Sequence, residues 1–123
     1  MNGFSIEAWR GGRYLSLADL LSVLGPQVRP LKWRLRTSEV APSPGAPLVE
    51  SLGADQLVDT QDILKLFPPS VQIVDGEICG HGASGELVLR IRAVDSTWWD
   101  IETDDSQLLR AIAEAFPDAI KLP

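Results

Sequence analysis

The sequence predicts an α+β fold, with an antiparallel or mixed sheet of about five strands and two or three helices. Residues 86–102 contain two runs in which apolar and polar side chains alternate, as they do in half-buried strands. Residues 104–116 instead repeat apolar side chains with the spacing of an amphipathic helix. We expect this C-terminal helix to pack on one face of the sheet.

The two alternating runs predict a central hairpin whose loop has two possible positions. A three-residue loop at residues 95–97 would pair Arg92 with Asp100 on the outer face. A loop at residues 94–96 keeps the same facing but places Trp98 over Arg92. Facing matters because a slip of one residue turns every side chain to the other side of the sheet. Both loops leave Trp98 on the charged face.

The helix that follows has clear boundaries in the sequence. Asp104 is a good N-cap, and Gln107 three residues later gives a pattern similar to a capping box. Asp105 would lie in the first turn, where a negative charge complements the helix dipole. Pro117 disfavours helical geometry at the residue before it, so the helix should end near Phe116.

Shorter elements are predicted on either side of this stretch. Strands are expected at residues 4–10, 31–36, 71–74, 77–79 and 119–122. Capped helices are expected at residues 16–24 and 59–67. The pair Asp75-Gly76 favours a tight hairpin turn. The proline-rich stretch 41–47 predicts a surface loop, followed by one helical turn at 48–53. All of these elements would belong to a single domain spanning residues 1–123.

Composition indicates an ordinary soluble protein. The 123 residues include one cysteine, which excludes an internal disulfide, and no apolar run approaches the length of a membrane span. No signal-peptide pattern is seen at the N-terminus, so a cytoplasmic location is expected. The net charge of −6 combines +4 in residues 1–36 with −10 in residues 37–123. We expect these two parts to neutralise each other in the fold.

The glycine-rich stretch 80–85 matches the spacing of a dinucleotide fingerprint, but a strand rather than a helix follows it. We therefore interpret it as a hairpin loop, and no cofactor is predicted. Cys79 and His81 would share one face of a strand, and a Cys–His pair can form a nucleophile. They are weak catalytic candidates, because the only histidine lies among glycines. No metal site is predicted, since a closed zinc site needs four ligands.

The strongest binding candidate is an acidic surface centred on an outward-facing tryptophan. Its predicted residues are Trp98, Asp100, Glu102, Asp105 and Arg92. Aromatic residues are enriched as anchors of protein interfaces. The leading hypothesis is therefore a non-catalytic domain that engages a basic protein partner or a second copy of itself. An immunity protein, or another inhibitor of a basic bacterial enzyme, is one concrete form of this hypothesis.

Two alternatives belong to other functional classes. A small enzyme or ligand-binding domain would use Cys79 and His81 beside the glycine-rich loop. A nucleic-acid binder would use the basic strand at residues 29–36, with the cations Arg29, Lys32, Arg34 and Arg36 around Trp33. The negative net charge disfavours this second alternative. Trp33 and Trp99 are assigned to the core, and no membrane partner is expected.

Overall fold

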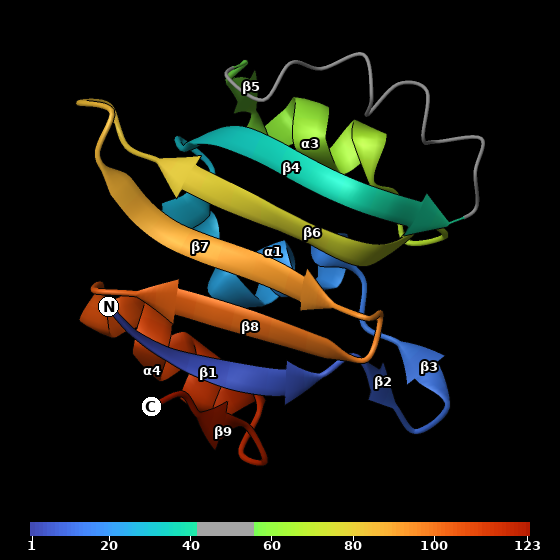
Figure 1. Cartoon of the computed structure of the whole chain (residues 1–123). Coiled ribbons are helices and arrows are strands. Elements are labelled where there is room, and N and C mark those ends of the chain that lie inside the picture. The colour runs from blue at the N-terminus through green and yellow to red at the C-terminus, as the bar shows by residue number, and fades with distance from the viewer. Residues whose placement is uncertain (42–55) are drawn as a thin grey trace.

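An antiparallel sheet of seven strands runs through the whole fold (Figure 1). The computed structural model describes residues 1–41 and 56–123, with the backbone alone described at residues 37–41. Across the sheet the strands are β5 (Val58–Asp59), β4 (Lys32–Ala41), β6 (Gln72–His81), β7 (Leu87–Val94), β8 (Trp98–Thr103), β1 (Asn2–Glu7) and β9 (Ile120–Lys121). The α+β fold is confirmed, with a wider sheet than the five strands expected.

The helices lie on one face of this sheet. They are α1 (Leu17–Leu24), the 3-10 helix η1 (Pro26–Val28), α3 (Thr60–Leu66) and α4 (Ser106–Ala115). Figure 1 shows α1 and α4 behind the strands. α3 lies on the same face, because Thr60 Oγ1 accepts a hydrogen bond of 2.8 Å from Nε1 of the buried Trp33. Within the described residues, no helix covers the opposite face of the sheet.

The core lies between the helices and the inward side chains of the strands. Burying one large apolar side chain is worth roughly 1.5–3 kcal/mol, so this layer supplies most of the driving force for folding. The largest buried side chains include Ile6, Leu20, Leu24, Trp33, Ile63, Phe67, Ile73, Ile78, Leu89, Ile91, Trp99 and Ile101. Trp33 and Trp99 therefore belong to the core, as predicted.

The central hairpin adopts the first of the two predicted registers. Arg92 lies opposite Asp100, and Ala93 lies opposite Trp99, across a loop at residues 95–97. Asp95 and Ser96 have φ angles of 52° and 49°. This left-handed conformation is open to residues whose short polar side chains bond locally. The predicted first strand, by contrast, is divided into β1 and β2 (Trp9–Arg10), and β2 pairs with β3 (Arg13–Tyr14) in a hairpin of its own.

Side-chain caps define the starts of α1 and α4. α1 begins with the predicted capping box of Ser16 and Asp19 and ends at Gly25. α4 begins one residue later than predicted, because its N-cap is Asp105 rather than Asp104. One carboxylate oxygen of Asp105 accepts the backbone N–H groups of Gln107 and Leu108 in the first turn, at 2.8 and 3.2 Å. The prediction of Asp104 as the cap was wrong.

The predicted hairpin turn at Asp75-Gly76 was also wrong. β6 runs without a break through this pair, and Gly76 lies between Thr37 of β4 and Ala93 of β7. Strand pairing on both sides outweighs the local turn preference of the dipeptide. The predicted proline-rich loop at 41–47 and the helical turn at 48–53 lie outside the described residues, apart from Ala41 at the end of β4.

Candidate functional site

The uncovered face of the sheet, which we call the open face, presents charged side chains in rows across the strands. Alternation along each strand sends these side chains away from the helices. One row runs from β4 to β8 through Arg34, Cys79, Arg90 and Glu102, and the next row through Arg36, Glu77, Arg92 and Asp100. The register of the strands therefore determines which charged side chains lie beside one another on the open face.

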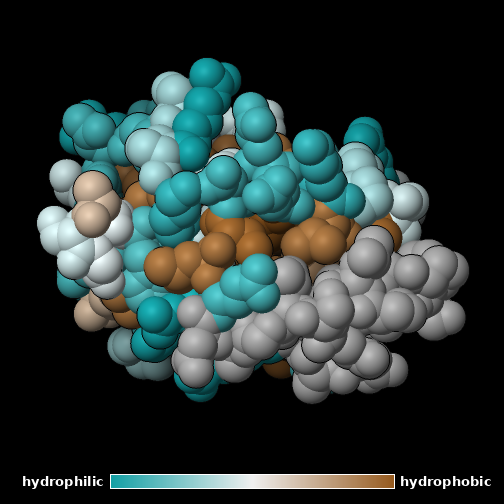
Figure 2. Space-filling model, turned by 90° about the horizontal axis from the view of Figure 1, so that it is seen from above, coloured by the Kyte–Doolittle hydropathy of each residue, from teal (hydrophilic) through white to brown (hydrophobic). Residues whose placement is uncertain are grey.

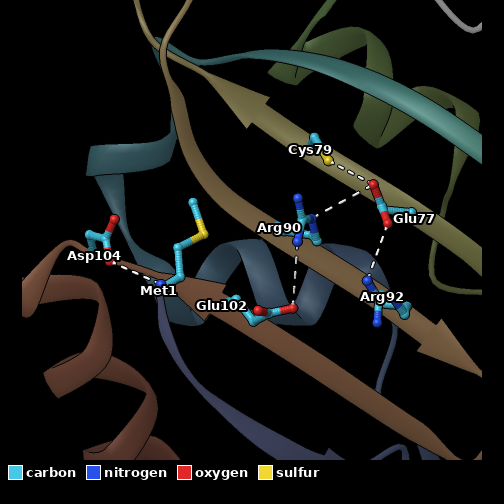
Figure 3. Close-up of polar contacts among 7 residues, drawn as sticks. All are labelled: Met1, Glu77, Cys79, Arg90, Arg92, Glu102 and Asp104. Carbon is cyan, nitrogen blue, oxygen red and sulfur yellow. Dashed lines mark hydrogen bonds and ion pairs between the residues drawn. The ribbon is translucent and has the colours of Figure 1, made fainter. Parts of the chain in front are cut away.

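Glu77 joins the middle of these rows into one ionic network (Figure 3). Its carboxylate lies 3.7 Å from Arg90 Nε and 3.4 Å from Arg92 Nη2, while Arg90 Nη1 lies 3.9 Å from Glu102 Oε1. Burial alone would raise the pKa of Glu77. The hydrogen bond from Cys79 and the two arginine charges outweigh that effect, so its pKa lies below the ordinary value. The middle of the open face is thus internally paired.

The environment of Cys79 favours a protonated thiol. Its Sγ lies 3.3 Å from Glu77 Oε1, to which the thiol donates. Burial raises the pKa of Cys79, the hydrogen bond and negative charge of Glu77 raise it further, and Arg90 opposes them. His81 Nδ1 instead contacts the carbonyl oxygen of Gly85 at 3.1 Å. Because each of the two side chains bonds elsewhere, the geometry gives no support to a Cys79–His81 nucleophile.

The glycine-rich stretch joins β6 to β7 as a hairpin loop. Gly85 has a φ of +83°, which glycine adopts without strain, and its N–H donates to the Gly82 carbonyl. A strand follows the loop, so no helix N-terminus faces it for a pyrophosphate to bind. Nor does the described part of the chain hold a group of three or more His, Cys, Asp or Glu side chains suited to a metal ion.

The β4 side of the open face is basic. Arg34 and Arg36 form no ion pair with any described residue, whereas Lys32 pairs with Asp59 of β5. Trp33 points the other way, into the core, where its ring is fully buried. The ring of Trp33, in its predicted core position, is therefore not available to stack on a base of a nucleic acid.

The β8 side of the open face is acidic and contains Trp98. The Trp98 side chain is half-buried, with Val94 of β7 opposite it on one side and Glu7 of β1 on the other. Val94 is 36% exposed. Neither Glu7 nor Asp100 forms an ion pair with a described residue. Trp98 and Val94 thus make a small apolar area bounded by carboxylates.

Trp98, Asp100, Glu102 and Arg92 share the open face, but Asp105 does not join them. It comes seven residues after Trp98, which is about 20 Å along an extended strand, and its carboxylate caps α4. Glu7 and Val94 were missed as members of the surface. Alternation along the first strand gives the facing of Glu7, but only the pairing of β1 with β8 places it beside Trp98.

A groove at the α3 edge is a second surface feature. It has a volume of about 540 Å³ and is lined by residues that include Arg29, Leu31, Thr60 and Leu64. Figure 2 views the molecule from this edge and shows a hydrophobic strip bordered by hydrophilic side chains. The Thr60 hydroxyl is already bonded to Trp33 and to the Val28 carbonyl. The groove therefore offers less specific chemistry than the open face.

Comparison of the chain with protein-family models, curated proteins and solved structures gives no match. Among the helices of the described residues, none combines the length and the apolar character needed to cross a bilayer.

Proposed function

We propose that this chain is a non-catalytic protein-binding domain, and that the β8 side of its open face engages a basic protein partner. The observation that supports this most directly is the half-buried Trp98 beside Val94, bounded by Glu7 and Asp100, whose carboxylates form no ion pair with a described residue. A large aromatic ring that is partly shielded from solvent is a typical anchor of a protein interface. The carboxylates around it would select a cationic partner and speed its association.

An immunity protein or another enzyme inhibitor remains the concrete form of this proposal. Such a protein needs a fixed surface complementary to a basic target and no chemistry of its own. The rigid antiparallel sheet provides the fixed surface, and a sequence pI of about 4.6 suits a basic target. The protonated Cys79 thiol favours this class over the alternative of a small enzyme.

The test compares the half-buried Trp98 with the exposed Trp9 in one binding assay. A basic partner would be selected with the wild-type protein, and its affinity for Trp98→Ala and Trp9→Ala would then be measured by calorimetry. Trp9 is a matched control, because it is 45% exposed but packs against Tyr14 in the β2–β3 hairpin. We expect Trp98→Ala to weaken binding at least tenfold, or about 1.4 kcal/mol, and Trp9→Ala to change it less than twofold.

Equal effects of the two variants, or none from Trp98→Ala, would contradict the proposal. Asp100→Asn supplies an independent measurement, because removal of this surface carboxylate should mainly slow association and reduce its dependence on salt. Stopped-flow association rates at several salt concentrations would show this effect.

A further inference from the structure

We infer that the open face also binds the open face of a second copy, through a twofold axis that runs parallel to the strands between β6 and β7. This inference shares with the proposed function the premise that the open face is an interaction surface. It adds a partner of defined chemistry, because the basic side of the face complements its own acidic side. The two proposals make different predictions and can fail separately.

Both rows of the open face run from a cation on β4 to a carboxylate on β8. Two cations that form no ion pair with the described part of the chain lie on β4, and carboxylates lie on β8, in the same two rows: Arg34 and Glu102 share one, and Arg36 and Asp100 share the other. β6 and β7 lie between them and contribute Glu77 and Arg92 to the second row. The open face therefore changes from basic at β4 to acidic at β8, and it does so in both rows.

A twofold axis parallel to the strands places the basic side of one copy over the acidic side of the other. Placed between β6 and β7, it exchanges β4 with β8 and β6 with β7 while it keeps each row in place. Arg36 of one copy then faces Asp100 of the other, and Arg34 faces Glu102. Glu77 likewise faces Arg92 of the second copy. Each contact is made twice, as it must be across an isologous interface.

A twofold axis that lies in the plane of the interface but perpendicular to the strands does not bring opposite charges together. It would lay β4 on β4 and bring Arg34 and Arg36 of one copy against the same residues of the other. Like charges in direct opposition are unfavourable and suppress that arrangement. The charge pattern therefore selects one mode of stacking, and two aligned sheets packed about 10 Å apart provide the usual geometry for it.

The contact should be weak and sensitive to salt. Its two rows span only four strands, each about 4.8 Å from the next, which places the buried area at the low end for specific interfaces. The pairs are ionic, and salt at about 0.15 M screens exposed charges beyond roughly 8 Å. We therefore expect a dimer at low salt and high protein concentration that dissociates as salt is added.

Charge reversal tests the proposed pairs directly. Mass would be measured by sedimentation and light scattering for wild type, Arg36→Glu, Asp100→Arg and an equal mixture of the two variants. Each variant alone opposes like charges at both copies of the contact and should be monomeric. In the mixture, both contacts again join opposite charges, so the mass should return to that of a dimer.

The control is Lys65→Glu, which reverses an exposed charge on α3, away from the open face, and should leave the wild-type mass unchanged. Circular dichroism would confirm that each variant is folded. A wild-type protein that is monomeric at low salt and high concentration would overturn the inference, as would a mixture that stays monomeric while the wild type dimerises.

Trp98→Ala separates this inference from the proposed function. Trp98 lies one row beyond the paired charges, so the variant should still dimerise while it loses affinity for a basic partner. A monomeric wild type whose binding to a basic partner depends on Trp98 would remove only the dimer. A dimer that obeys the charge-reversal test, together with partner binding that ignores Trp98, would remove only the proposed function.

Discussion

Cys79 shows how single neighbours decide the chemistry of a residue. Its strand places it between two arginines, Arg34 of β4 and Arg90 of β7, an arrangement that would normally favour a thiolate. Burial opposes this effect by raising the pKa of Cys79, and the carboxylate of Glu77 raises it further, because it accepts the thiol proton in a hydrogen bond and adds a negative charge nearby. The thiol is therefore kept protonated within a cationic part of the surface.

Removal of the Glu77 charge should therefore make Cys79 more reactive. Burial, the hydrogen bond to Glu77 and its charge all raise the pKa of Cys79. In Glu77→Gln the charge is lost while Arg90 remains, so we expect alkylation by iodoacetamide to be several-fold faster near pH 8. The midpoint of the pH–rate profile should move to lower pH. Glu114→Gln, at an exposed position on α4, is the control, and an equal change there would refute the explanation.

The facing of Trp98 was predictable at the residue scale, whereas its burial was not. Alternation fixes the side of the sheet on which a side chain lies, and Trp98 does lie on the charged side. Its half-buried state depends on Val94 and Glu7, which reach it from two other strands. The same limit applies to Cys79 and His81, since a bulge between Gly80 and His81 changes the pairing there.

At the scale of elements, the start of α4 illustrates a choice that the sequence leaves open. Asp104 and Asp105 are adjacent acids, and either could cap a helix that begins here. The difference arises before the helix, where Thr103 Oγ1 accepts the N–H of Asp105 at 3.1 Å. Asp104 is left exposed and lies 3.5 Å from the N-terminal amine of Met1.

The two acids should therefore differ in their contribution to stability. Asp105→Ala removes the acceptor for two backbone N–H groups, and we expect it to lower the free energy of unfolding by about 0.5–2 kcal/mol. Asp104→Ala breaks only an exposed ion pair and should cost less than about 1 kcal/mol. Urea unfolding followed by tryptophan fluorescence would measure both changes. A larger loss for Asp104→Ala would contradict the observed cap.

The failed turn at Asp75-Gly76 has a related cause. Asp-Gly favours a tight turn only where the chain is free to reverse. Here β4 and β7 pair with the strand on both sides, and Asp75 uses its carboxylate to accept the N–H of Asp95 at 3.0 Å. Asp75, which predicted a turn in its own strand, therefore stabilises the loop at residues 95–97 by a hydrogen bond.

For the whole molecule, the sequence predicted the fold class and the hairpin but not the order of the strands. Pairing of β1 with β8 joins segments from opposite ends of the chain, and no local pattern in the sequence predicts it. The sequence predicts which positions of each strand carry charges. Without the order of the strands, it does not predict which of these charges lie beside one another in a row. The basic and acidic sides of the open face, which support both proposals, therefore became visible only in the folded structure.

The expected neutralisation of the N-terminal cations is observed for some of them. Arg10 forms two hydrogen bonds to Asp118, at 2.9 and 2.6 Å, and lies over the ring of Phe116. Lys32 pairs with Asp59. Arg34 and Arg36 remain unpaired among the described residues, and their position at one side of the sheet leaves the open face polar.

The acids paired in these networks should make stability depend on pH. The hydrogen bond from Arg10 lowers the pKa of Asp118, and the pKa of Glu77 is also low, because Cys79 and the arginines outweigh its burial. A carboxyl group with a lower pKa in the folded state binds fewer protons there than in the unfolded chain. Its contribution is therefore present above the unfolded pKa, about 4, and is lost as pH falls through the folded value.

The double variant Glu77→Gln, Asp118→Asn tests this dependence. We expect it to be less stable than wild type at pH 7, with a difference that shrinks toward pH 3, because protonation removes the same charges from the wild type. Urea unfolding at pH 7, 5 and 3, at a concentration where the protein is monomeric, would follow the difference. Glu114→Gln removes an exposed carboxylate of α4 that has no ion pair among the described residues, and should track the wild type throughout. A difference of the same size at pH 3 as at pH 7 would mean that the two acids stabilise the fold through packing or neutral hydrogen bonds, and not through their charge.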